Sequence, residues 1–105
     1  MPAGGAEMDF VVVPLPGTSL TDFIASELQG TMSLSTSTTT VSGSHCTQES
    51  FTDSYGPTII YGNIAIYCPQ GKHLYKLYLS YREGDPMESQ FVHSFQQVLS
   101  SITLP

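Results

Sequence analysis

The stretch GKHLYKLYLSYREGDPMESQFVHSFQQVLSSI, residues 71–102, decides the fold. Its first part, residues 73–82, alternates as a half-buried strand does. One face carries Tyr75, Leu77, Leu79 and Tyr81, and the other carries Leu74, Lys76, Tyr78, Ser80 and Arg82. The second part repeats apolar residues with a helical period, namely Phe91, Val92, Phe95, Val98, Leu99 and Ile102. We expect this helix to begin at the Asp85–Pro86 cap, to end near Ser101 and to pack on the tyrosine–leucine face.

The segments upstream complete a sheet. Residues 9–14 predict a short strand, and residues 19–28 predict a helix that Thr18 or Ser19 caps and Gly30 ends. The β-branched stretch 31–41 predicts a strand that turns at 42–44 and returns through 45–52. On that return, Glu49 and Phe51 would share one face. Residues 53–57 are expected to form a loop.

The last predicted strand covers residues 58–68, with a bulge or break at Gly62–Asn63, and a hairpin turn follows at 69–72. The resulting order is β-α-β-β-β-β-α. It predicts an α+β domain with a curved antiparallel sheet of about five strands flanked by two helices. With 105 residues, the chain is long enough for one domain, which we place at 9–105, after a linker or cloning remnant at 1–8.

Composition narrows the range of partners. Nine acidic residues against three basic ones give a net charge of −6, which argues against nucleic acid and anionic membranes as partners. No apolar run reaches the roughly 20 residues of a membrane span. Only 11% of the residues are charged, so hydroxyl groups must contribute much of the surface. This composition is frequent in exported bacterial proteins.

The two cysteines bear on the compartment. Cys46 and Cys68 can form a disulfide, or they can be two buried free thiols. A bridge would join two neighbouring strands of the predicted sheet. We expect an extracytoplasmic protein, secreted, luminal or lipid-anchored, with a cytoplasmic location as the alternative. The start of the chain shows no signal peptide, and an export signal or anchor removed upstream stays open.

Two stretches resemble PsbP-like domains. GKHLYKLYLSY, residues 71–81, resembles a strand of that family, and FVHSFQQVLSSI, residues 91–102, resembles its last helix. Residues 19–28 and 39–43 are similar to earlier parts of the family, whose N-terminal hairpin with a tryptophan has no counterpart here. The resemblance implies an antiparallel sheet flanked by helices. It also implies a binding or assembly role without enzymatic activity.

The candidate chemistry in the sequence is sparse. A serine nucleophile of the G-x-S-x-G type is missing, and the neighbours His45 and Cys46 would point to opposite faces of a strand. Three carboxylates, Glu83, Asp85 and Glu88, are weak metal candidates, although a turn and a helix cap already explain them. We expect no cofactor and no enzymatic activity.

A protein partner of unknown identity is the favoured function, because tyrosines are frequent at interfaces. The expected patch consists of Leu74 and Tyr78 with Ile64 or Ile66 on the neighbouring strand. One alternative is a small ligand-binding or metal-binding domain, or an enzyme, with a pocket between sheet and helix. A second alternative is a structural module of a larger secreted or surface protein.

Overall fold

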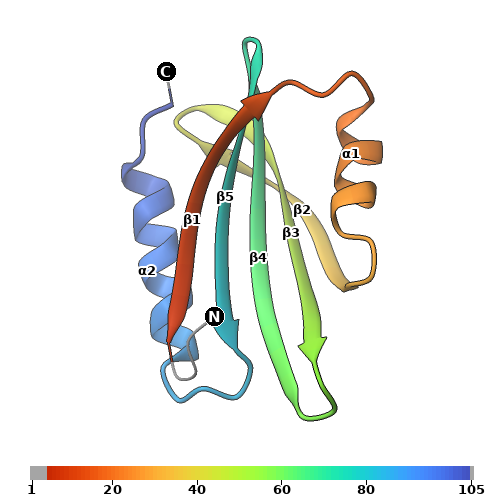
Figure 1. Ribbon diagram of the computed structural model, residues 1–105. Coiled ribbons are helices and arrows are strands. Elements are labelled where there is room, and N and C mark those ends of the chain that lie inside the picture. Colours follow the sequence, from red (N-terminus) through yellow and green to blue (C-terminus); the bar gives the residue numbers. More distant parts are fainter. Residues whose placement is uncertain (1–4, 105) are drawn as a thin grey trace.

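The computed structural model describes residues 5–104 and confirms the predicted α+β fold (Figure 1). Five strands and two helices follow one another in the order β-α-β-β-β-β-α. Their bounds are β1 Ala6–Pro14, α1 Leu20–Glu27, β2 Met32–Val41, β3 Ser44–Tyr55, β4 Ile59–Gln70, β5 His73–Arg82 and α2 Glu88–Ser101. Residues 1–4 of the predicted linker lie outside the residues that the structure describes.

The strands form one antiparallel sheet in the order β1-β5-β4-β3-β2. Strands β2 to β5 form a meander with short turns, as consecutive antiparallel strands do. The first strand, β1, adds to the outer side of β5, and α1 carries the chain to the opposite edge at β2 (Figure 1). The sheet therefore has two edges in the described chain, one formed by β1 and one by β2.

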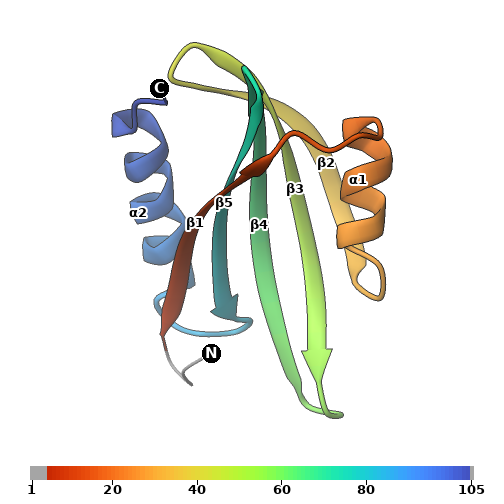
Figure 2. The same ribbon diagram turned by 45° about the horizontal axis from the view of Figure 1, so that its top comes forward.

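The two helices lie on opposite faces of the sheet (Figure 2). The helix α2 covers the face that carries Tyr75, Leu77 and Leu79, as the sequence predicts. On the other face, Ile24 of α1 packs in a second buried cluster with Phe51 and Leu74. Both faces of the central strands are therefore buried, and the domain has three layers.

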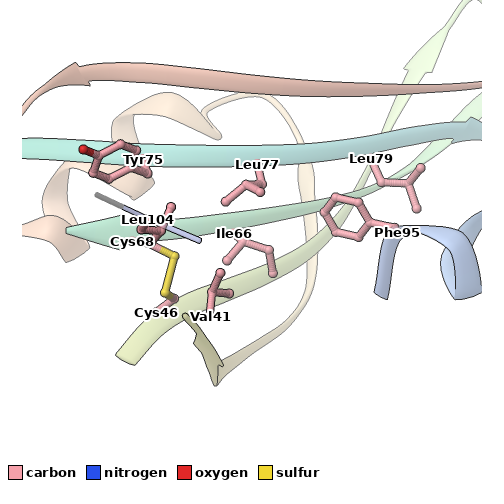
Figure 3. Close-up of a cluster of buried hydrophobic side chains, with 9 residues drawn as sticks. All are labelled: Val41, Cys46, Ile66, Cys68, Tyr75, Leu77, Leu79, Phe95 and Leu104. Atoms are coloured by element: carbon pink, nitrogen blue, oxygen red, sulfur yellow. A yellow bond between two sulfur atoms is a disulfide. The ribbon is translucent and has the colours of Figure 1, made fainter. Parts of the chain in front are cut away.

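A disulfide joins β3 to β4 inside the cluster under α2. Cys46 and Cys68 are both almost fully buried, with their Cα atoms 4.5 Å apart. Figure 3 shows the bridge beside Val41, and it shows Phe95 of α2 next to Leu79 of β5. Of the two alternatives that the sequence left open, the structure contains the disulfide rather than two free thiols.

Several boundaries differ from the prediction. The strand β4 runs to Gln70, through half of the turn expected at 69–72, because Pro69 and Gln70 still pair with β5. The strand β1 begins at Ala6, inside the segment expected to be a linker, because its pairing with β5 starts at Ala6 opposite Tyr81. The strand β3 continues through the expected loop at 53–55. The Asp53 carboxylate accepts a hydrogen bond of 2.9 Å from the Asn63 amide, which holds this end in the sheet.

The start of α2 also differs. The helix begins at Glu88 rather than at Asp85–Pro86, and Met87 is its N-terminal cap residue. The Asp85 carboxylate instead accepts a hydrogen bond of 2.8 Å from the Met87 backbone N–H, within a separate turn. The end of α2 at Ser101 agrees with the prediction. At α1 the Ser19 hydroxyl accepts from the Asp22 N–H, which confirms the predicted cap.

The Gly62–Asn63 pair is neither a bulge nor a break. Both residues keep a continuous register with β3 and β5. The glycine is needed because the Tyr81 ring lies over it: a β-carbon at Gly62 would lie 2.7 Å from that ring. The Asn63 side chain donates to Asp53 and accepts from the Ser80 hydroxyl, so its polar groups are satisfied across three strands.

Candidate functional site

The interface patch expected from the sequence is not formed. Leu74 and Ile66 are completely buried, and Ile64 packs against the cluster under α2. Leu74 and Tyr78 belong to the opposite face, under α1. The prediction of one patch is wrong, because helices cover both faces of β4 and β5 and leave neither free.

Tyr78 instead takes part in a polar cluster at the end of α1. The Glu27 carboxylate accepts hydrogen bonds from the Tyr67 hydroxyl at 2.9 Å, from the Lys76 ammonium at 3.0 Å and from the Tyr78 hydroxyl. The Lys76 nitrogen also lies 5.7 Å from the centre of the Phe23 ring. The cluster fastens the C-terminal end of α1 to β4 and β5.

Electrostatics keep this cluster in one protonation state. Burial alone would raise the pKa of the Glu27 carboxyl, but hydrogen bonds from Tyr78, Lys76 and Tyr67 outweigh it and hold the pKa below its ordinary value. Burial raises the pKa of both tyrosines, and the neighbouring Glu27 raises them further. Glu27 is therefore an anion near neutral pH, and both phenols remain hydrogen-bond donors. This arrangement suits a structural anchor.

Exposed large apolar side chains are concentrated on the edge strand β1. Alternate residues Met8, Phe10 and Val12 point to the α2 face and are between 42 and 49% exposed. Val11, on the other face, and Leu15, just beyond the strand, are exposed as well. No strand pairs with the outer side of β1 in residues 5–104. The backbone groups that point outward from this edge are available to another strand.

The opposite edge, β2, is built differently. Seven of its ten residues, MSLSTSTTTV, are serine or threonine, and eight of the ten are exposed. Its register shifts between Ser33 and Ser35. A bulge of this kind disturbs the regular spacing that an added strand needs. An open hollow beside its start is lined by Met32, Leu34 and Ile60 together with Asp53 and Glu83. The β2 edge is thus more polar and less regular than β1.

A carboxylate that the sequence analysis did not single out lies buried under α1. Glu49 of β3 is only 7% exposed, and it is the one buried charged residue among those described. The Thr36 hydroxyl, on β2, lies 3.0 and 2.8 Å from its two carboxylate oxygens. The Glu49 side chain also lines an open cavity of about 290 Å³ between α1 and β2. In the sequence, the signal for the burial of Glu49 was its predicted place on the same strand face as Phe51, which the structure confirms.

The weak metal candidates do not assemble. No group of three histidine, cysteine, aspartate or glutamate side chains among residues 5–104 is placed to hold a metal ion. Glu83, Asp85 and Glu88 lie around the turn between β5 and α2. Burial, and then the charges of Glu88 and Glu83, raises the pKa of Tyr81.

Comparison with known proteins adds no family. No protein-family model and no curated protein matches this sequence. Within the described residues, neither helix combines the length and the apolar character that crossing a bilayer requires.

Proposed function

We propose that this chain is a non-catalytic, extracytoplasmic protein-binding domain of the PsbP-like type that binds its partner through β1. The observation that carries the proposal is the exposed apolar edge formed by Met8, Phe10 and Val12. The family part rests on the sequence stretches 71–81 and 91–102. Because one fold supports many functions, the binding role is argued from the edge itself.

The edge offers two kinds of contact at once. Along β1, the outward-facing N–H and C=O groups can form a ladder with an extended partner segment. The side chains of Met8, Phe10 and Val12 provide a continuous apolar stripe on one face of that ladder. Backbone hydrogen bonds give affinity in this mode of recognition, and alternate side chains give specificity.

Charge selects the partner. The strand carries Glu7 and Asp9, and the whole chain has a net charge of −6. Pairing two copies of β1 would bring two acidic molecules together, which electrostatic repulsion disfavours. The occupant that fits is an extended segment of a different protein. Its apolar residues would alternate over Phe10 and Val12, and a basic residue would lie near Asp9.

The disulfide supports an extracytoplasmic location. Disulfides form and persist in oxidising environments and are rare in the cytosol. The buried Cys46–Cys68 bridge therefore favours a secreted, luminal or lipid-anchored protein over a cytoplasmic one. A structural module of a larger surface protein would have the same bridge. That alternative differs because it requires no segment of another protein to bind at β1.

The test uses peptides selected for binding to the intact domain from a random octapeptide library. We expect extended peptides with Kd in the micromolar range whose binding is lost when alternate backbone nitrogens are methylated, since methylation removes the ladder donors. Phe10→Thr keeps strand propensity and removes apolar contact, and it should weaken binding roughly tenfold or more. Leu34→Thr makes a matched change on β2 and should change Kd less than about twofold.

Two results would contradict the proposal. Selected peptides could bind Phe10→Thr as tightly as the unmodified domain, which would place their site elsewhere. Peptides could also keep their affinity after backbone methylation, and strand addition at β1 would then be wrong.

A further inference from the structure

Glu49 is a buried carboxylate that no positive charge pairs with among the described residues. Burying an ionised carboxylate is costly unless a positive charge or several hydrogen bonds compensate for it. The single ion pair within residues 5–104 joins Lys76 to Glu27, so it does not involve Glu49. The Thr36 hydroxyl has one proton, which the two oxygens of Glu49 share. A carboxylate accepts about four hydrogen bonds, so most of its capacity remains unused.

Glu49 lines a cavity between α1 and β2. One wall of the cavity is apolar and comes from α1, with Ile24, Ala25 and the following Leu28. The hydroxyl-bearing residues Thr21, Thr31 and Ser33 also line the cavity. The volume of about 290 Å³ is enough for one small group and too small for a drug-sized ligand.

From this arrangement, we propose that the cavity binds an organic cation, an ammonium or guanidinium group on a short aliphatic stem, with Glu49 as its counter-ion. The ammonium supplies three N–H donors and the missing positive charge. The methylene groups of the stem pack against Ile24 and Leu28. A divalent metal ion fits less well, because Ca²⁺ and Mg²⁺ seek six or more oxygen ligands with several carboxylates among them, and one carboxylate lines this cavity.

This site is independent of the proposed strand addition. It lies on the α1 face beside β2, whereas β1 is at the opposite edge of the sheet (Figure 1). The cation has two natural sources: a free small amine, or the side chain of a lysine or arginine on another protein. Both present the same chemistry to Glu49.

The test is an NMR titration of the intact, oxidised domain with n-butylammonium chloride. We expect saturable shifts of the backbone amides of Ile24, Leu28 and Thr36, and binding at least tenfold weaker for n-butanol, which has the stem without the charge. Glu49→Gln keeps the size and the Thr36 hydrogen bond, and it should weaken n-butylammonium binding roughly tenfold to a hundredfold. Glu7→Gln makes the same chemical change on β1 and should leave Kd unchanged within about twofold.

A second variant keeps the test decisive if Glu49→Gln does not fold. Ala25 is exposed and lines the cavity, so Ala25→Phe should fill the cavity and abolish binding while Glu49 stays in place. Saturation at the same Kd in Glu49→Gln or Ala25→Phe would overturn the proposal. The absence of any saturable shift with n-butylammonium would also overturn it.

A parallel titration with Nα-acetyl-lysine methylamide distinguishes the two sources of the cation. If the lysine derivative binds as tightly as n-butylammonium, the site accepts a protein side chain. If the cavity excludes it while n-butylammonium binds, the ligand is a free amine. Both results support the organic-cation site.

Discussion

Removing the Cys46–Cys68 bridge should lower the stability of the domain substantially. The bridge closes a loop whose ends are 22 residues apart in the sequence. The loop-entropy relation gives a stabilisation of roughly 3 kcal/mol for a loop of this length. Since domains of this size are stabilised by about 5–15 kcal/mol in total, the loss is a large fraction.

The measurement is guanidinium unfolding followed by circular dichroism. The oxidised domain is compared with the same protein reduced in denaturant and refolded in reductant, so that all side chains are kept. A loss of roughly 3 kcal/mol corresponds to a midpoint lower by about 1 M guanidinium and a Tm lower by roughly 12–25 °C. The double variant Cys46→Ala/Cys68→Ala should unfold near the reduced protein, and reductant should not change its midpoint.

Equal midpoints for the oxidised and reduced proteins would contradict this prediction. Agreement within about 0.5 kcal/mol would mean that the bridge adds nothing to the pairing of β3 and β4.

Two further substitutions test the packing and the electrostatics. Gly62→Ala should destabilise the domain by about 1–2 kcal/mol, because its methyl group would displace the Tyr81 ring. In a Tyr81→Ala background, the same change should be close to neutral. An equal loss of stability in both backgrounds would exclude the ring as the cause. Glu27→Gln should lower stability at pH 7 by about 1 kcal/mol through weaker hydrogen bonds to Tyr67 and Lys76. Since the folded-state pKa of Glu27 lies below its ordinary value of 4.5, this contribution is present above pH 4.5 and is lost as the pH falls through the folded-state pKa. Urea unfolding of both proteins between pH 3 and 7 should show the difference shrinking toward acid pH, and a difference that grew there would reverse the assigned sign.

The parts of the fold that the sequence predicted well are those with a strong period. Strict alternation in residues 73–82 predicted the bounds of β5, and the helical spacing from Phe91 to Ile102 predicted the face of α2 that packs on it. The expected strand order was compatible with a Cys46–Cys68 bridge, but it left two free thiols as an open alternative. These signals are local, and the tertiary structure agrees with them.

The parts that failed depend on contacts between distant segments. Gly62 resembles a break in isolation, and only the Tyr81 ring on the next strand explains it. Alternation separates the two faces of β5, but it does not show that α1 and α2 cover both, so the patch around Leu74 was misplaced. The burial of Glu49 likewise depends on where α1 crosses the sheet.

The β1 edge joins the fold to the proposed function. An exposed, apolar and regular edge strand is an aggregation risk that soluble proteins usually reduce with charges, bulges or short strands. Here β2 has a bulge and hydroxyl side chains, whereas the Phe10–Val13 part of β1 has no charged residue. Retaining such an edge is consistent with a partner that covers it.

The binding of a partner protein at β1 is tested most directly by site-specific photocrosslinking in the organism that makes the protein. A benzophenone amino acid replaces Val12 on β1 in one variant and Thr38 on β2 in the control, since both positions are exposed. Our account predicts a crosslink from position 12 to one different protein, and none from position 38. No crosslink at position 12, equal crosslinks at both edges, or a crosslink only to a second copy of this chain would contradict it.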